Sequence, residues 1–238
     1  IAEMGSNMIM IHPGADMRGG VRLDAADMQS LKLEDYYSIV NEAGYVSACS
    51  PSVSSGGQTI YGANNYPTTM YGVNPDYLEI RKYSVAEGEM FSEQDILSSA
   101  KVCVIGKTIV DNLFTNGEEP VGKIIRFGKI PFRIIGVLAS KGYNTMGMDQ
   151  DDLMLAPYTT IQKRVLAITH LQSIFCSALT EEKTEDAEAE ISSILRRNHK
   201  LKDVDDDDFN IRSQQELSTM MNSTTDMMTM LLACIAGI

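Results

Sequence analysis

The segment that most suggests chemistry is VIGKT, residues 104–108, which ends in the Gly-Lys-Thr triplet of phosphate-binding loops. A complete loop of that kind also needs a glycine five residues before Gly106, because that glycine lets the backbone bend around the phosphates. Lys101 stands at that place instead. We therefore interpret the segment as a turn between a strand and a helix, with Lys107 in solvent, and we predict no nucleotide or other cofactor here.

Two acidic runs have the composition of calcium loops but lack their defining positions. In DVDDDDFN, a loop beginning at Asp203 would need glycine at its sixth place and glutamate at its twelfth, and these places hold Asp208 and Gln214. In MDQDDL, a loop beginning at Asp149 would have Leu153 at its third ligand place. Both runs are predicted to be solvated loops, and we predict no metal site.

The histidines give no catalytic pattern either. His12, His170 and His199 are far apart in the sequence, none has a histidine partner four residues away, and no G-x-S-x-G segment is present. The sequence leaves open a pairing of one histidine with a cysteine or serine, but nothing in it points to one. We therefore name no catalytic residue and predict that this segment is not an enzyme.

Composition narrows the classes of partner. The chain has 238 residues, 20 of them basic and 32 acidic, for a formal net charge of -12. A surface of this sign repels phosphate backbones, so nucleic acid is excluded as the expected partner. Cys49, Cys103 and Cys176 lie in strand-like apolar segments, and we interpret them as small buried hydrophobes rather than a disulfide or metal set. Their spacing does not decide the redox compartment.

Alternating and helical patterns predict a mixed α+β chain. Helices are predicted over residues 32–44, over 107–114 and, capped by Thr184, over 184–200. A hairpin over residues 57–73 is predicted to turn at Asn64 and Asn65, and another to turn at Gly128. Further strands are predicted over residues 7–12, 45–53, 101–106, 123–127, 131–138, 151–158, 171–179 and 208–213.

The C-terminal helix begins amphipathic and becomes apolar all round. Ser213 and Glu216 have the spacing of a capping box, and apolar residues then recur at helical spacing as far as LLACIAGI. We interpret this end as the first turns of a truncated transmembrane helix. The alternative is a helix packed on the protein's own core. The part of this helix before the membrane is predicted to be a stalk, which includes Gln215, Leu217, Met220, Met221, Thr224 and Met228.

The N-terminus has a matching feature. The segment IAEMG resembles the last turn of a helix that ends at Gly5, so both ends are expected to point at one bilayer. The chain opens without Met, and we interpret it as a piece of a longer protein. Its middle has a different composition from its ends. We therefore expect an outer α+β unit (residues 1–75 and 165–214), an inserted strand-rich α/β unit (76–164) and a stalk helix (215–238).

Several segments together resemble the extracytoplasmic core domain of MacB-type ABC transporter permeases, which are related to the FtsX and lipoprotein-release permeases. The resemblance covers nearly the whole chain, although Lys32 stands where a helix-capping threonine is expected. It is carried by NMIMIHPG, by YGVNPDYLEIRKYSVAEGEMFSEQD, by VCVIGKTIVDNLF, by EPVGKIIRFGKIPFRIIGVLASKG, by QDDLMLAPYTT and by LLACIAGI.

The resemblance implies a location and a mode of action. It places the domain on the periplasmic side of the inner membrane, between two transmembrane helices, with the outer unit forming a porter-like βαβ-type subdomain. ATP would be hydrolysed by a separate cytoplasmic domain, and helix movement would pass to this domain by mechanotransmission to drive export or efflux. The implied partners are a second copy of the full transporter, a periplasmic adaptor and an outer-membrane exit duct.

Two other functions stay open at this point. One is an FtsX-like or lipoprotein-release-type domain that regulates or binds a periplasmic protein. The other is a soluble periplasmic ligand-binding or enzyme domain with a pocket between the subdomains. The exposed loop SKGYNTMGMDQDD is the candidate surface for a protein partner, through Tyr143, Asn144, Met146 and Met148.

Overall fold

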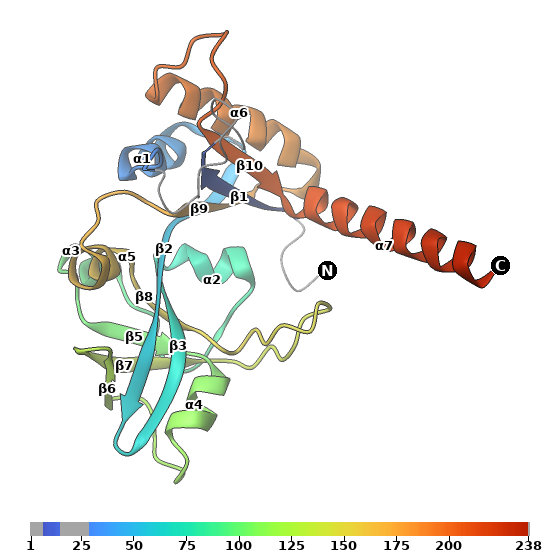
Figure 1. The fold of residues 1–238 in the computed structure, drawn as a ribbon. Coiled ribbons are helices and arrows are strands. Elements are labelled where there is room, and N and C mark those ends of the chain that lie inside the picture. Colours follow the sequence, from blue (N-terminus) through green and yellow to red (C-terminus); the bar gives the residue numbers. More distant parts are fainter. Residues whose placement is uncertain (1–6, 15–28, 238) are drawn as a thin grey trace.

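A computed structural model describes residues 7–14 and 29–237, with the backbone alone at residues 215, 218, 220 and 221. The helix turn expected before Gly5 lies outside these residues. The described strands form one continuous hydrogen-bonded path, which divides into two sheets that share one long strand, β2 (Val46–Tyr61). Figure 1 shows the two sheets at different levels of the molecule, with β2 running from one to the other.

The first sheet is antiparallel, in the order β10-β1-β9-β2, and is built from both ends of the chain. It contains β10 (Phe209–Ser213), β1 (Met8–Pro13), β9 (Ser173–Ala178) and the first part of β2. Alternate side chains of a strand point to opposite faces. Ile9 and Ile11 accordingly lie in the main core with the buried side of α1 (Leu33–Glu42) and α6 (Thr184–Asn198). On the other face, Met8 packs with Ile80 of α2 (Asp76–Arg81).

The second sheet continues from the far half of β2. From Val53 onward β2 pairs with β3 (Asn64–Val73), and the order then runs β8, β5, β7 and β4, with β6 joining β2 to β7. Its other strands are β4 (Val85–Gly88), β5 (Val102–Ile105), β6 (Ile124–Phe127), β7 (Ile130–Leu138) and β8 (Met154–Pro157). Because β3 pairs with β8 as well as with β2, the hairpin predicted over residues 57–73 lies in this sheet.

Short helices surround the second sheet. They are α3 (Glu93–Leu97), α4 (Lys107–Leu113) and α5 (Tyr158–Thr160), which continues into a π-helical turn (Ile161–Leu166). Their buried side chains, such as Ile109 and Ile161, join the same continuous core that fills the space under α1 and α6. The mixed α+β architecture predicted from the sequence is confirmed.

The first hairpin turns two residues earlier than predicted. Tyr61 pairs with Asn64, so Gly62 and Ala63 form the turn, and Gly62 takes a positive φ of 57°. Glycine adopts that conformation without steric cost, which favours it over asparagine at this place. Asn64 instead opens β3, and its side-chain amide donates to the carbonyl oxygen of Leu113 at 2.8 Å. The two strands predicted before the turn are the single strand β2.

The predicted cap of α6 is also wrong. A short 3₁₀ helix (Glu181–Lys183) leads directly into α6, so Thr184 already has helical backbone angles of -59° and -45°. A capping residue needs an extended backbone to turn its side chain onto the next N–H groups. The Thr184 hydroxyl is buried and has no hydrogen-bond partner.

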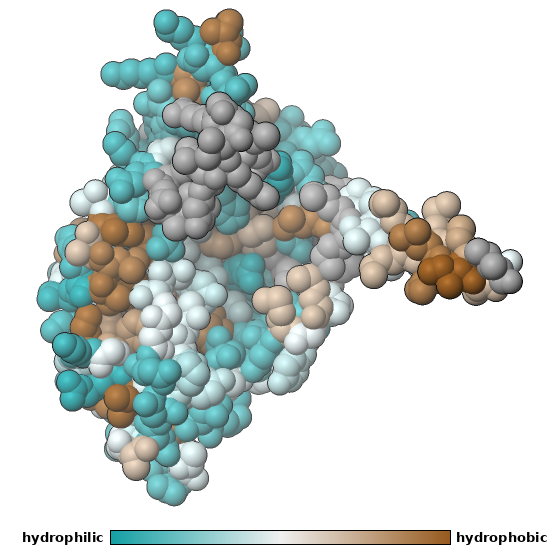
Figure 2. Space-filling view, viewed as in Figure 1, coloured by the Kyte–Doolittle hydropathy of each residue, from teal (hydrophilic) through white to brown (hydrophobic). Residues whose placement is uncertain are grey.

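The last helix, α7 (Gln214–Ala236), projects away from the first sheet (Figure 1). Leu231, Leu232 and Ile235 keep 62–71% of their surface exposed, so they are not packed on the protein's own core. Figure 2 shows the strongly apolar side chains gathered at the outer end of this helix. Within the described residues, no helix has both the length and the apolar content that crossing a bilayer requires.

Candidate functional site at the base of the C-terminal helix

The junction between β10 and α7 is held by two hydrogen bonds of a capping box. The Ser213 hydroxyl accepts from the Glu216 N–H at 3.1 Å, and the Glu216 carboxylate accepts from the Ser213 N–H at 3.4 Å. Ser213 is also the last residue of β10 and pairs with Ile9 of β1. The predicted capping box is therefore confirmed, and it fixes the direction in which α7 leaves the sheet.

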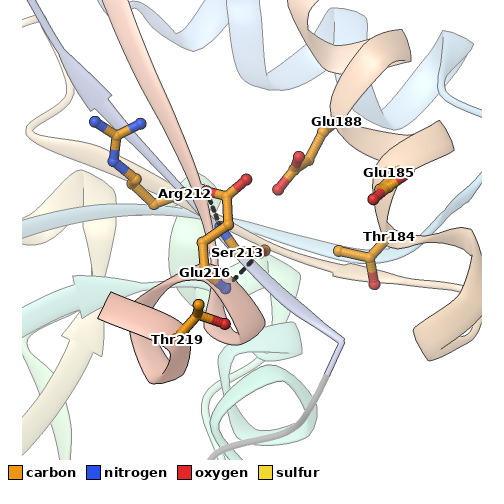
Figure 3. A pocket seen from close by; sticks show the side chains of 7 residues that line it. All are labelled: Thr184, Glu185, Glu188, Arg212, Ser213, Glu216 and Thr219. Atoms are coloured by element: carbon orange, nitrogen blue, oxygen red, sulfur yellow. Dashed lines mark hydrogen bonds between the residues drawn. The ribbon is translucent and has the colours of Figure 1, made fainter. Parts of the chain in front are cut away.

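A hollow of about 500 Å³ lies beside this junction (Figure 3). Three elements form its walls: the start of α6, the end of β10 and the first turns of α7. Its lining is mostly polar and acidic, and consists of Thr184, Glu185, Glu188, Arg212, Ser213, Glu216 and Thr219. Any tilt of α7 relative to α6 changes the spacing of these side chains.

Glu188 and Glu216 point their carboxyl groups toward one another across this hollow (Figure 3). One oxygen of Glu188 is buried without a hydrogen-bond partner. Burial, followed by the charge of Glu216, raises the pKa of Glu188 to about 7, although a hydrogen bond with Ser213 and the charge of Arg212 oppose the rise. Near neutral pH Glu188 is thus partly protonated, which relieves the repulsion between α6 and α7.

The predicted stalk residues all lie on α7, but the structure describes their side chains unevenly. Leu217 is half-buried near the sheet, while Thr224 and Met228 are exposed further out. Gln215, Met220 and Met221 are described by backbone alone. All six belong to one uninterrupted helix of 23 residues.

The loop predicted to meet a partner is an ordered hairpin at the edge of the second sheet. Asn144 organises its tip, since its side-chain oxygen accepts from the N–H groups of Met146 at 2.9 Å and Met148 at 3.0 Å. An isolated bridge joins Tyr143 to Asp149. Tyr143, Met146 and Met148 expose 72%, 52% and 60% of their surface. The tip therefore presents one aromatic and two thioether side chains on a fixed backbone.

The base of this loop is fixed by the carboxylate of Asp151, which is 5% exposed. It accepts from the Ser140 hydroxyl at 2.7 Å and from the N–H groups of Lys141 and Gly142 at 2.7 and 3.0 Å. In Figure 1 the loop reaches out on the side to which α7 points. The structure brings the loop and the stalk to one side of the molecule, but on different sheets.

Gly106 and Lys107 have structural roles in the strand-to-helix turn. The Gly106 N–H donates to the carbonyl oxygen of Leu153 at 2.9 Å, and a methyl group on Gly106 would overlap the carbonyl oxygen of Asp151. Glycine is therefore required here for close approach of two backbones. Lys107 forms an exposed ion pair with Asp111 at 3.3 Å.

The sequence reasoning missed a buried histidine network. His199 Nε2 lies 2.9 Å from Asp35 Oδ2, and its Nδ1 lies 2.6 Å from Asp208 Oδ1. Burial opposes protonation, but the hydrogen bonds to Asp208 and Asp35 outweigh it and raise the pKa of His199 above its usual value. This network joins α1, the end of α6 and the segment before β10.

The acidic run that contains Asp208 is engaged in local contacts. Asp207 forms an ion pair with Arg196, and the Asp205 carboxylate accepts from the Lys202 N–H at 2.7 Å. Among the described parts of the chain, no three histidine, cysteine or acidic side chains are grouped as a metal site would need.

These features define the class of protein. It is a porter-like α+β domain of two joined sheets, from which a capped helix projects. The sequence matches the MacB-like periplasmic core domain over residues 1–194. The chain belongs to this family, as the periplasmic domain of a MacB-like ABC transporter permease.

Curated relatives cover nearly all of this chain. A macrolide export ATP-binding/permease protein MacB from Syntrophobacter fumaroxidans is 32% identical over 99% of it, and one from Chlorobium luteolum is 35% identical over 99%. The chain spans only 40% and 35% of those two relatives.

Solved structures show the same fold. The periplasmic region of MacB from Actinobacillus actinomycetemcomitans aligns with a TM-score of 0.75 at 24% identity, covering 93% of this chain and 95% of that one. The extracellular domain of the transporter YknZ from Gram-positive bacteria aligns with a TM-score of 0.67 at 19% identity, covering 87% and 100%.

Proposed function

We propose that this domain couples ATP hydrolysis on the cytoplasmic side of the inner membrane to export on the periplasmic side, by transmitting helix movement through α7. The observation that carries the proposal is the direct, capped junction at Ser213. There the last strand of the first sheet passes without a loop into a capped helix of 23 residues. A stiff helix joined to a sheet moves the sheet with it, whereas a flexible linker would not.

The outer end of α7 supports a connection to the membrane. Met227, Met228, Met230, Leu231, Leu232 and Ile235 are all more than 60% exposed. Exposed apolar side chains on every face of a helix are stable only when lipid or another apolar surface covers them. We propose that residues 215–228 form the stalk and that the helix continues into the bilayer.

The relatives' names, which describe macrolide export proteins with both ATP-binding and permease parts, support a place for this domain in a larger transporter. We propose that the ATPase resides in a separate cytoplasmic domain or subunit and that two copies of the full transporter act together. A periplasmic adaptor and an outer-membrane duct would complete the export route. The division of the domain into two subdomains, one of them inserted, is part of this proposal.

A proline in the stalk tests the coupling. Met221 is the eighth residue of α7, so Met221→Pro removes an interior hydrogen bond and kinks the helix at a local penalty of about 3 kcal/mol. In the full transporter we expect ATP hydrolysis to persist while export falls about tenfold or more. Both are measured on purified transporter in proteoliposomes with its adaptor.

The control is Met221→Leu, which keeps helix propensity and volume and should leave export unchanged. Circular dichroism of the isolated chain checks that its two sheets and their helices still fold in both variants. Normal export by a folded proline variant would refute the proposed role of the stalk in coupling.

The ordered loop favours a second function, which is the binding of a periplasmic protein. Its tip holds Tyr143, Met146 and Met148 in solvent on a backbone organised by Asn144, so little ordering entropy is lost when a partner covers it. In an efflux assembly that partner would be the adaptor. In an FtsX-like role it would be a regulated enzyme of the cell envelope.

Replacing all three tip side chains with serine tests the loop. We expect adaptor binding, measured by surface plasmon resonance on the purified full transporter, to weaken about tenfold or more, because exposed anchor residues contribute about 1–2 kcal/mol each. Leu97 on α3 is 76% exposed and lies outside the loop, so Leu97→Ser is the matched control. Equal adaptor affinity of the triple variant and the wild type would show that the loop does not contribute to the adaptor interface.

A further inference from the structure

Cys49 of β2 and Cys176 of β9 lie directly opposite each other on neighbouring strands of the first sheet. They are register partners in the antiparallel pairing, and their Sγ atoms lie 3.3 Å apart. Their exposed fractions are 3% and 0%, and both are thiols in the structure. They belong to the core between the sheet and its helices α1 and α6.

The backbone of Cys49 shows which kind of cross-strand pair this is. Its N–H donates to Asp76 Oδ2 at 3.4 Å, and its carbonyl oxygen accepts from the side-chain amide of Asn74 at 2.8 Å. Both groups therefore turn away from β9, and the two cysteines form a non-hydrogen-bonded pair. In such pairs the Cα atoms lie about 4.5 Å apart, which is within the range of about 4.4–6.8 Å that a disulfide spans.

We propose that Cys49 and Cys176 form a disulfide in the periplasm, a modification that neither their spacing in the sequence nor their apolar surroundings suggests. The bacterial periplasm is oxidising, and this proposal depends on the periplasmic location of the family rather than on the coupling function.

The bond forms by thiol–disulfide exchange with an oxidised dithiol oxidoreductase. The thiolate of one cysteine attacks a sulfur of the donor disulfide and releases one donor thiolate. The thiolate of the second cysteine then attacks the resulting mixed disulfide and releases the other donor thiolate. The chain loses two electrons and two protons, and the donor is reduced to its dithiol.

The exchange takes place before the first sheet closes. In the folded chain the hydrogen bond to Cys176 and burial raise the pKa of the Cys49 thiol, and only a thiolate is reactive. Both side chains are also out of reach of a protein oxidant. Once the sheet has formed, the same burial protects the bond from reductants.

The link has a specific mechanical effect. It lies in the part of β2 that pairs with β9, just before Val53, where β2 passes into the second sheet. It also closes a loop that contains the whole second sheet, because that sheet lies between the two cysteines in the sequence. The disulfide therefore links β2, through which the chain leaves the first sheet, to β9, through which the chain returns to it.

Counting thiols in exported protein tests the proposal. The full chain, with exposed Cys234 replaced by serine to prevent linkage between chains, is secreted to a bacterial periplasm and quenched in acid. After unfolding and alkylation with N-ethylmaleimide, intact mass spectrometry should find one labelled cysteine, Cys103, in the periplasmic protein. Protein made in a reducing cytoplasm should carry three labels.

Peptide mapping identifies the bond. A peptide pair joined through Cys49 and Cys176 supports the proposal, whereas three labels in periplasmic protein, or a bond to Cys103, overturns it. Cys49→Ser and Cys176→Ser should each give two labels. If neither variant folds, the label count and the map of the parent protein still decide the question.

Discussion

Glu188 and His199 are ionisable side chains at the boundary between the first sheet and the helices beside it, and their contributions to stability change with pH in the same direction. Each has a pKa raised in the folded state, Glu188 to about 7 and His199 above its usual value. A raised pKa means that the folded chain binds the proton more tightly than the unfolded chain does. Both contributions are therefore full at acidic pH and decline as pH rises through the folded-state pKa.

Glu188→Gln tests this at the base of the stalk. Glutamine stays neutral, so between about pH 5.5 and pH 8 we expect the melting temperature of the variant to fall by about 3 °C less than that of the wild type, in which Glu188 becomes charged. The decline that remains in the variant is the contribution of His199. Circular dichroism melts at several pH values measure the difference. Glu182→Gln, at an exposed position of the 3₁₀ helix before α6, is the control and should keep the wild-type slope.

The other groups that face Glu188 are Glu216, Glu185 and Arg212, and the first two work in the same direction by charge repulsion. An equal pH slope in wild type and Glu188→Gln would mean that this carboxyl group is not protonated in the folded chain.

The turn between β5 and α4 gives its Gly-Lys-Thr sequence a structural role. Its Gly-Lys-Thr sequence suggests phosphate binding, but Gly106 lies against the backbone of Asp151, whose carboxylate fixes the partner loop. The same contact that excludes a side chain at Gly106 thus supports the base of the loop at Tyr143. The predicted strand-to-helix turn is confirmed, since β5 ends at Ile105 and α4 begins at Lys107.

Gly106→Ala should destabilise the chain by about 1–3 kcal/mol, because the new methyl group overlaps a backbone oxygen and the turn must open. Gly56→Ala in β2 is the matched control: no atom lies within 4 Å of its added methyl group, so its effect should stay within about 0.5 kcal/mol. Urea unfolding of both variants measures the two values. A neutral Gly106→Ala would show that the backbones do not pack as described.

The whole molecule is organised by β2, which serves both sheets. Its first part pairs with β9 and its second part with β3, and one continuous core lies behind both. The sequence pattern instead predicts two strands here, one over residues 45–53 and one that begins the hairpin at Gly57. It correctly pairs β3 with the end of β2 as a hairpin, but it does not give the pairing of β3 with β8, because a strand's alternation says which face is buried and not which strand lies beside it.

Features decided by neighbours within one or two turns could be read from the sequence itself. The capping box at Ser213, the apolar periodicity of α7 and the tight turn at Gly128 depend on local backbone geometry and short-range hydrogen bonds. The set of family-like segments also allowed the fold class and the family to be predicted correctly.

Only the tertiary structure could bring together residues that are distant along the chain. His199 meets Asp35 across 164 residues, and Cys49 meets Cys176 across 127. Such pairs are fixed by strand register and helix packing, which depend on the whole core. No local pattern encodes them, and for that reason the histidine network, the cysteine pair and the hollow beneath α7 were absent from the sequence analysis.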